Sequence, residues 1–223
     1  MPLSKDNVIL NAPYSKEEIR LNEIYNKIEN KTFIAGGIPD EFCENKTIQN
    51  IDLLQSEFLT ILNAILTAEG TIKVVIEETE KAIFESNVMI LGYGRIGKIL
   101  CKNFRDLGAK VYGVARKEKD LIWIREEKCI PITYDEIEKE AKNMDIMINT
   151  VPSLVITEKI IKKLQKDCII IDIASAPGGV DKNIAKRYKI KQITALGLPG
   201  KIAPLTAAKF IKETIEKELK WQD

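Results

Sequence analysis

From Asn87 onward the chain alternates between short apolar runs and longer amphipathic segments. The apolar runs are rich in Val and Ile and lack polar alternation, which is typical of parallel strands buried on both faces. Strands that alternate with helices predict a doubly wound α/β domain with a parallel sheet. The expected strands are 87–92, 110–115, 129–132, 145–150, 168–173 and 190–195, and the expected helices are 95–107, 118–127, 135–143, 157–165 and 181–187.

The pattern before Asn87 is less regular. Ser15 and Glu18 form a capping-box signature that opens an amphipathic helix, and 32–35 predicts a short strand. We expect three parts in the chain. They are a smaller, incomplete N-terminal α/β domain with a connecting helix (1–85), an NAD(P)-binding Rossmann domain (86–202) and a C-terminal helix (203–223) that packs back on the first part or on a partner.

A long helical region is predicted at 53–84. We expect Gly70 to interrupt it, with a break at 63–70 and Thr67 as the cap of the second half. The polar groups of Asn63, Thr67 and Glu69 lie at this expected kink. They are either helix caps and a solvated carboxylate, or part of a site next to the cofactor domain.

The most informative motif joins the first strand of the alternating region to its helix. Gly92, Gly94 and Gly97 follow the apolar run 88–91, and a helical pattern begins at once. In a dinucleotide site the first glycine permits a tight turn, the second lets a pyrophosphate approach the backbone, and the third lets the helix pack close to the strand. The helix N-terminus offers amide groups to the phosphates. We interpret the motif as a cofactor site, with a plain structural turn as the alternative.

The next strand is followed by Arg116 and Lys117, where an NAD enzyme usually carries an acid for the adenosine ribose. Two cations in that place suit a 2′-phosphate, so we expect NADP, with NAD possible. The alternative is that both residues begin an exposed helix and that selectivity is loose. The expected cofactor-binding residues are Gly92, Tyr93, Gly94, Arg95, Ile96, Gly97, Ala115, Arg116, Lys117, Thr150, Val151, Pro152 and Ala174.

Three more loops are expected at the same edge of the sheet, because doubly wound sheets bind ligands outside the carboxyl ends of their strands. They are 149–153, 174–179 and 197–204. Asp172, inside the preceding strand, is either a buried hydrogen-bonded group or an orienting one. Gly200 is expected to offer open amides, and Lys201 to meet a substrate carboxylate. The expected substrate-binding residues are Asn63, Thr67, Ser175, Pro177, Gly178, Gly179, Pro199 and Gly200.

Composition narrows the function classes. The 34 basic and 33 acidic residues nearly cancel, which leaves no electrostatic footprint for nucleic acid or an anionic membrane. We recognise no signal peptide and no apolar run long enough to span a bilayer. The four scattered cysteines lack paired metal spacing, so we expect a reducing cytoplasm, no disulfides and no metal site. The chain has no histidine, the commonest general base.

Five segments, taken in order, resemble the NAD(P)-binding, A-type subunit of dipicolinate synthases: 63–70, 92–97, 149–153, 174–179 and 197–204. The resemblance covers nearly the whole chain. It implies an NAD(P)-dependent oxidoreductase of the cytoplasm of the mother cell in sporulating bacteria, which oxidises dihydrodipicolinate, formed from 4-hydroxy-tetrahydrodipicolinate, to pyridine-2,6-dicarboxylate. It also implies the flavoprotein-like, B-type subunit of dipicolinate synthase as partner, and we expect a homo-oligomer. The family has a longer N-terminal domain and often a proline in place of Leu66, so the chain resembles a version with a shortened N-terminal domain.

The implied chemistry agrees with the residues. Oxidation of a dihydropyridine forms an aromatic ring, so a strong base is less necessary. The substrate's two carboxylates call for cations and N–H groups, with Lys201, Ser175, Gly178, Gly179 and Thr67 as candidates. The catalytic residue is left open, with Glu69 and Lys201 as candidates.

Two alternatives remain. One is a 2-hydroxy-acid dehydrogenase or an adenosylhomocysteine-hydrolase-like enzyme, although both normally use a histidine. The other is a catalytically silent NADP-binding subunit that senses redox state or organises a partner.

Overall fold

The computed structural model describes residues 7–10, 32–35 and 49–220. The chain divides into two compact units, 1–63 with 204–223 and 64–203, and each is described by itself. The helix expected after Ser15 lies outside the described residues.

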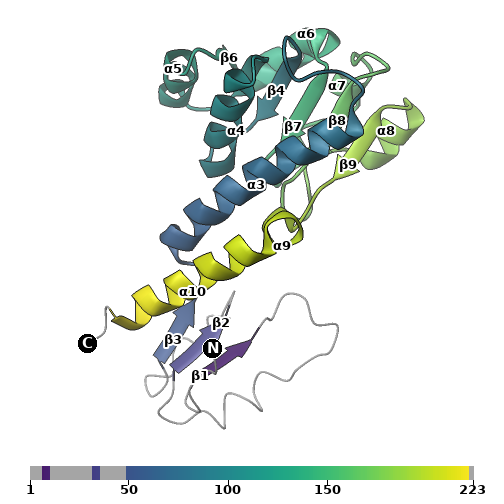
Figure 1. Cartoon of the computed structure of the whole chain (residues 1–223). Helices are drawn as coiled ribbons and strands as arrows, with labels where there is room; N and C mark the ends of the chain where they lie inside the picture. Colours follow the sequence, from purple (N-terminus) through teal and green to yellow (C-terminus); the bar gives the residue numbers. More distant parts are fainter. Residues whose placement is uncertain (1–6, 11–31, 36–48, 221–223) are drawn as a thin grey trace. The chain divides into compact units, whose positions relative to one another are not determined.

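The strands are β1 (Asn7–Leu10), β2 (Thr32–Ala35), β3 (Gln49–Asp52), β4 (Asn87–Leu91), β5 (Lys110–Val114), β6 (Ile130–Ile132), β7 (Ile146–Asn149), β8 (Ile169–Asp172) and β9 (Lys191–Thr194) (Figure 1). The helices are α3 (Glu57–Glu78), α4 (Arg95–Asp106), α5 (Glu118–Glu126), α6 (Ile137–Glu140), α7 (Glu158–Ile161), α8 (Lys182–Arg187), α9 (Leu198–Ile202) and α10 (Pro204–Lys220), with 3₁₀ turns η1 (Tyr134–Glu136) and η2 (Ala141–Asn143) on either side of α6.

The first unit contains a three-stranded parallel sheet in the order β1-β2-β3. The strand expected at 32–35 is confirmed as β2, whereas β3 was not expected. Ile51 of β3, Leu53 and Leu59 are buried and form a small hydrophobic cluster. Phe210 and Ile215 of α10 pack against this cluster, so the apolar face of α10 forms part of the hydrophobic core of this unit.

The second unit confirms the expected parallel sheet. Its six strands run in the order β6-β5-β4-β7-β8-β9, and the order reverses between β4 and β7. Along β4 the side chains are buried on both faces: Val88 and Ile90 join the core cluster that includes α4, and Met89 and Leu91 join the one that includes α6 and α7. At such a reversal of strand order, doubly wound sheets bind ligands outside the carboxyl ends of the central strands.

The expected break in the long helix is wrong, because α3 runs without interruption through Gly70. A β-carbon built on Gly70 would lie 2.9 Å from the β-carbon of Leu198 and 2.8 Å from the δ-carbon of Ile202. The glycine therefore permits close contact with α9 and does not end a helix. Thr67 accordingly lies inside α3 and caps nothing; its carbonyl oxygen accepts from the Thr71 hydroxyl at 2.8 Å.

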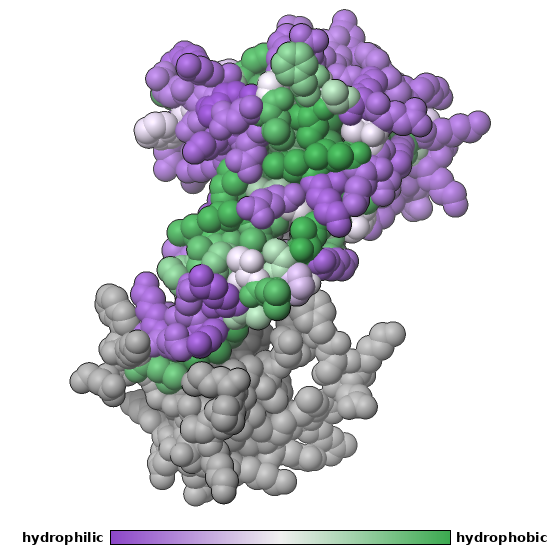
Figure 2. Space-filling model, viewed as in Figure 1, coloured by the Kyte–Doolittle hydropathy of each residue, from purple (hydrophilic) through white to green (hydrophobic). Residues whose placement is uncertain are grey.

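By length and composition α3 could cross a membrane, which corrects the expectation that no segment is apolar enough. Core helices of soluble proteins meet the same criterion. Ala68 and Val75 of α3 are completely buried in the core of the second unit. Ile65 and Ile76 are exposed, and Figure 2 shows hydrophobic side chains along this helix. Packing of one face on the sheet explains part of its composition.

Other expected helices differ in detail. The helix expected at 135–143 is divided into η1, α6 and η2, and the one expected at 157–165 ends at Ile161. The segment expected to be a loop at 197–204 contains α9, which begins with a proline in its first turn. At the helix starts, the Asp181 carboxylate accepts from the Ile184 amide at 3.1 Å and caps α8, whereas Thr157 makes no side-chain cap on α7.

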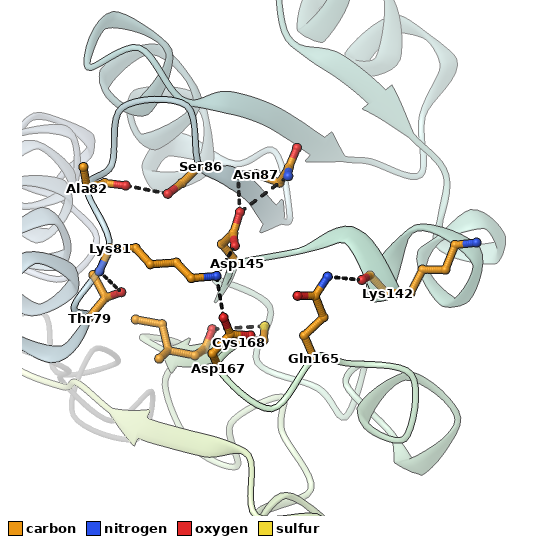
Figure 3. A network of polar contacts seen from close by, with 11 residues as sticks. Thr79, Lys81, Ala82, Ser86, Asn87, Lys142, Asp145, Gln165, Asp167 and Cys168 are labelled. Atoms are coloured by element: carbon orange, nitrogen blue, oxygen red, sulfur yellow. Dashed lines mark hydrogen bonds and ion pairs between the residues drawn. The ribbon is translucent and has the colours of Figure 1, made fainter.

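A network of ionic groups ties the segment after α3 to the amino ends of the strands (Figure 3). Lys81 Nζ lies 2.6 Å from a carboxylate oxygen of both Asp145 and Asp167, which precede β7 and β8. The Asn87 amide, at the start of β4, donates to Asp145 at 2.8 Å. These partners raise the pKa of Lys81 and lower that of Asp167 through hydrogen bonding. These groups lie at the amino ends of the strands, whereas the glycine turn follows the carboxyl end of β4.

Candidate cofactor site

The need for each glycine in the turn after β4 follows from what a β-carbon at its position would contact. Gly92 has φ +95°, and a β-carbon there would collide with the Thr150 hydroxyl. A β-carbon on Gly97 would collide with the carbonyl oxygen of Gly92, because α4 returns close to the strand. A β-carbon on Gly94 would meet no atom within 4 Å. The first and third glycines are thus required by protein contacts, and the middle one is not.

Open space at Gly94 fits the pyrophosphate of a dinucleotide. Gly94 is the N-cap residue of α4 and makes no side-chain cap. Helix geometry leaves the first amide groups of α4 without partners inside the helix, and the helix dipole favours negative charge there. The following turn contains no acidic side chain that would compete with a phosphate. The residues present therefore fit a bound dinucleotide.

The side chains of the glycine turn and of the first turn of α4 differ in burial and charge. Tyr93 is partly buried against the core, and this burial raises its pKa to about 12. The Lys98 ammonium lies 5.5 Å from the centre of the Tyr93 ring. Arg95 and Ile96 begin α4, and Arg95 is exposed. The phenol is therefore neutral at physiological pH, and the positive charge at this end of α4 comes from Arg95 and Lys98.

The cationic pair after β5 lies at the carboxyl edge of the sheet. Ala115 is buried, and its amide donates to Ile132 of β6 at 3.1 Å. Arg116 and Lys117 are exposed, and Lys117 is the N-cap residue of α5. The Arg116 guanidinium carbon lies 5.2 Å from the centre of the Tyr134 ring. The alternative reading, in which these residues begin an exposed helix, agrees with Lys117, but Arg116 is laid against an aromatic ring.

Two buried polar side chains, which were not among the expected cofactor- or substrate-binding residues, organise the loops after β7 and β8. Asn149 and Asp172 are completely buried, and the strand register pairs them. The Asn149 amide donates to Asp172 Oδ1 at 2.8 Å and to the Val151 carbonyl at 2.9 Å. Its oxygen accepts from the Val151 amide at 3.1 Å. Asp172 is therefore the buried hydrogen-bonded group that the sequence left as one possibility.

The Asp172 carboxylate also holds the loop 174–179. It accepts from the Gly179 amide at 3.0 Å and from the Ala174 amide at 3.3 Å. A β-carbon on Gly178 would lie 2.8 Å from Asp172 Oδ2, and one on Gly179 would collide with the Asn149 amide. The Gly178 amide donates to the Ser175 carbonyl at 2.9 Å. The expectation of free amides at both glycines is therefore wrong, because both amides have acceptors in the protein.

The loop after β7 is also attached to the glycine turn. The Thr150 amide and hydroxyl both donate to the Leu91 carbonyl, at 3.0 and 2.8 Å. Val151 is partly buried, and Pro152 is exposed beside it. The hydroxyl proton of Thr150 is thus occupied by the backbone, and its oxygen remains an acceptor. The structure brings Thr150, Val151 and Gly92 together across the switch point between β4 and β7.

The remaining expected residues lie on one loop and on two helices. Ser175, Ala176 and Pro177 are exposed in the loop after β8, and Ala174 is buried below them. Pro199, Gly200 and Lys201 belong to α9, and a β-carbon on Gly200 would meet no atom within 4 Å. Thr67 and Glu69 lie on α3 within one turn of Gly70, which contacts α9, whereas Asn63 lies two turns earlier on that helix. The roles of these residues toward a cofactor or substrate stay predictions.

Asn149 and Asp172 had a recognisable signal. Each is the polar last residue of an otherwise apolar strand, Ile-Met-Ile-Asn and Ile-Ile-Ile-Asp. Adjacent parallel strands place such residues side by side at the carboxyl edge. Tyr134 was missed as well, and only its contact with Arg116 marks it.

Comparisons with known proteins agree with this geometry. Residues 66–198 match the family described as D-isomer specific 2-hydroxyacid dehydrogenase, NAD binding domain. The A-type subunit of dipicolinate synthase from Bacillus subtilis (strain 168) is 33% identical over 216 residues, which cover 95% of this chain and 73% of that protein. The crystal structure of the A-type subunit of dipicolinate synthase from Bacillus halodurans superposes with a TM-score of 0.85 at 31% identity, over 96% of this chain and 79% of the other. A transhydrogenase from Sinorhizobium meliloti, 14% identical with a TM-score of 0.72 over 96% of this chain and 74% of its own, shares the fold alone.

Proposed function

The chain belongs to the family of dipicolinate synthase A-type subunits, and we propose that it oxidises a dihydrodipicolinate to pyridine-2,6-dicarboxylate, with NADP as the hydride acceptor. Its cofactor domain is an NAD-binding domain of the 2-hydroxyacid dehydrogenase type. In the proposed reaction the substrate, formed from 4-hydroxy-tetrahydrodipicolinate by loss of water, gives up one hydride and one proton. Aromatisation drives the step.

The observation that carries the proposal is the contrast among the three glycines. Gly92 and Gly97 are crowded by protein atoms, whereas Gly94 faces open space at the start of α4. Unlike its two neighbours, that open glycine has no packing reason inside the described chain. Bound NADP⁺ would supply the hydride-accepting ring. The turn 92–97 would hold its pyrophosphate, Arg116 and Lys117 its 2′-phosphate, and the loop at Thr150 and Val151 its nicotinamide half.

The chain's own groups would then bind and orient the dicarboxylate. The exposed positions Ser175 and Lys201, on the loop after β8 and on α9, offer a hydroxyl and an ammonium group to its carboxylates. The Asn149–Asp172 pair keeps that loop in place from below. With no histidine in the chain, Glu69 and water are the proposed proton acceptors, and Lys201 in its charged form acts on the carboxylate.

The setting follows from the family. We propose that the flavoprotein-like, B-type subunit of dipicolinate synthase completes the enzyme, that the chain forms a homo-oligomer, and that it acts in the cytoplasm of the mother cell during sporulation. Similarity to one named subunit of a synthase supports the existence of a partner.

The test measures NADPH absorbance and dipicolinate formation from NADP⁺ and freshly made 4-hydroxy-tetrahydrodipicolinate, with and without the B-type subunit. NADPH and dipicolinate should appear in equal amounts. Gly94→Val is the matched inactive variant, because its side chain would enter space that is empty of protein atoms and leave the fold intact.

The outcomes separate the hypotheses. Turnover only with the B-type subunit would make this chain one part of a two-component enzyme. NADPH binding without turnover in either mixture would overturn the enzymatic proposal in favour of a silent cofactor-binding protein. Turnover with NAD⁺ at equal kcat/KM would remove the NADP preference and keep the oxidoreductase.

A further inference from the structure

The exposed guanidinium of Arg116, which follows β5, lies against the aromatic ring of Tyr134, which follows the neighbouring strand β6. Tyr134 begins η1, two residues after β6, and β6 pairs with β5. The Arg116 guanidinium carbon lies 5.2 Å from the centre of the Tyr134 ring. The ring is half-buried, and this burial raises the pKa of the Tyr134 phenol, although the charge of Arg116 and its hydrogen bond to the phenol oppose the rise. A partly buried ring is a stationary support for a long, flexible side chain.

Within the described part of the chain, Arg116 forms no ion pair with a carboxylate. The nearby acid Glu136 is engaged elsewhere, because its Oε2 accepts from the amide and the hydroxyl of Thr133, both at 2.8 Å. These bonds hold the pKa of Glu136 below its usual range. The donors of the guanidinium are therefore available to an anion at the carboxyl end of β5, where the adenosine ribose of a dinucleotide lies.

We propose that Tyr134 is a specificity-determining positioning residue that holds the Arg116 guanidinium ready for the 2′-phosphate of NADP. The inference rests on the proposed NADP preference. A guanidinium already laid on a ring loses less side-chain freedom when it binds phosphate. NAD carries an uncharged hydroxyl in that place, so it gains little from the same arrangement. The ring face supports the guanidinium, and a side-chain hydrogen bond also links the Tyr134 phenol to Arg116.

The experiment compares dissociation constants for NADPH and NADH, measured by nucleotide fluorescence with the full chain. Tyr134→Ala should weaken NADPH by about two- to fivefold, the loss expected for one exposed cation–π contact, and leave NADH unchanged. Tyr134→Phe, which keeps the ring and removes the hydroxyl group, should weaken NADPH less than Tyr134→Ala does and leave NADH unchanged. In an Arg116→Ala background, Tyr134→Ala should have no further effect on NADPH.

A matched control exists in the same unit. Arg187 lies over the Tyr188 ring at 5.3 Å at the end of α8, and both side chains of this second Arg–Tyr pair also bond to Glu158. Tyr188→Ala should leave both dissociation constants unchanged, which separates loss of a surface Arg–Tyr contact in general from loss of this one. Circular dichroism confirms that each variant is folded.

Other results would overturn the inference. Equal weakening of NADPH and NADH by Tyr134→Ala would mean that the ring only supports the fold. A loss of NADPH affinity in Arg116→Ala without any in Tyr134→Ala would reject Tyr134 and keep NADP as the cofactor. Equal affinity of the wild-type chain for both nucleotides would reject the NADP preference, and Tyr134 with it, while leaving the oxidoreductase assay to stand.

Discussion

Replacement of Asp172 by Asn should destabilise the second unit strongly although the two side chains have nearly the same shape. The carboxylate accepts from Asn149 on one oxygen and from the Gly179 amide on the other, and it is completely buried. An asparagine must place its NH₂ group against one of these donors. Rotation of Asn149 does not help, because the oxygen of Asn149 is needed by the Val151 amide.

The magnitude follows from the bonds that are lost. A hydrogen bond to a charged group contributes about 1.5–3 kcal/mol, and a buried donor left without a partner costs about 1–3 kcal/mol. Asp172→Asn should therefore lower the free energy of unfolding by about 3–5 kcal/mol. This is a large share of the roughly 5–15 kcal/mol that stabilises a typical domain. With a urea m-value of about 2–3 kcal/mol/M, the midpoint should fall by about 1–2 M.

Urea denaturation followed by far-UV circular dichroism measures the shift. The matched control is Asp181→Asn, where the carboxylate is only partly buried and caps α8, a role that asparagine fills equally well. The exchange variant with Asn149→Asp and Asp172→Asn restores a donor opposite an acceptor, and should be about 2 kcal/mol more stable than the two single changes added together. A midpoint for Asp172→Asn equal to that of Asp181→Asn would refute the role given to the buried pair.

Three further predictions concern other positions. Gly94→Val should leave the free energy of unfolding within about 0.5 kcal/mol of wild type and weaken NADPH binding at least about tenfold. Gly97→Ala should lower both stability and NADPH affinity, because its β-carbon meets a backbone carbonyl. Urea denaturation and titration calorimetry together distinguish the two variants. Gly70→Ala should cost about 1–3 kcal/mol, because the added methyl group overlaps α9, and its urea midpoint checks this against the gain that alanine gives in an open helix. Lys81 keeps the pKa of Asp167 below its usual value, so this pair stabilises the protein above about pH 4 and loses that contribution as the pH falls through the lowered pKa; Asp167→Asn should reduce the acid sensitivity measured by thermal melts between about pH 5 and 3.

Local signals made the cofactor domain predictable. Apolar runs alternate with amphipathic segments, and each run is long enough to form one strand, so the six strands and their parallel arrangement followed from the pattern. Burial on both faces was wrong for β9, whose residues are half-buried or exposed. The glycine turn was equally local, because all three glycines act within a few residues of one another. The expected helices at 135–143 and 157–165 failed in detail, since their 3₁₀ and α segments are short and tertiary contacts decide their ends.

The roles of Gly70, Gly178 and Gly179 could not be predicted from the sequence, because they depend on contacts between distant segments. Gly70 carried the usual signal of a helix break, but its role is set by Leu198 and Ile202 on α9, far along the chain. The amides of Gly178 and Gly179 were expected to be free, and the Asp172 carboxylate and the Ser175 carbonyl occupy them instead. A residue type shows what a group can do, whereas the fold determines which partner is within reach.

The amino ends and the carboxyl ends of the strands in the six-stranded sheet therefore have different roles, and substitutions at the two ends test this difference. At the amino edge, Lys81 joins Asp145 and Asp167 through contacts that are partly exposed, so changes there should alter stability modestly and leave cofactor affinity alone. At the carboxyl edge, stability and binding share the same loops. Asn149 and Asp172 hold the loops after β7 and β8, and Thr150 of the first loop bonds to Leu91, which directly precedes the glycine turn. Changes to the buried pair should reduce stability and nucleotide affinity together, whereas Gly94→Val should reduce affinity alone.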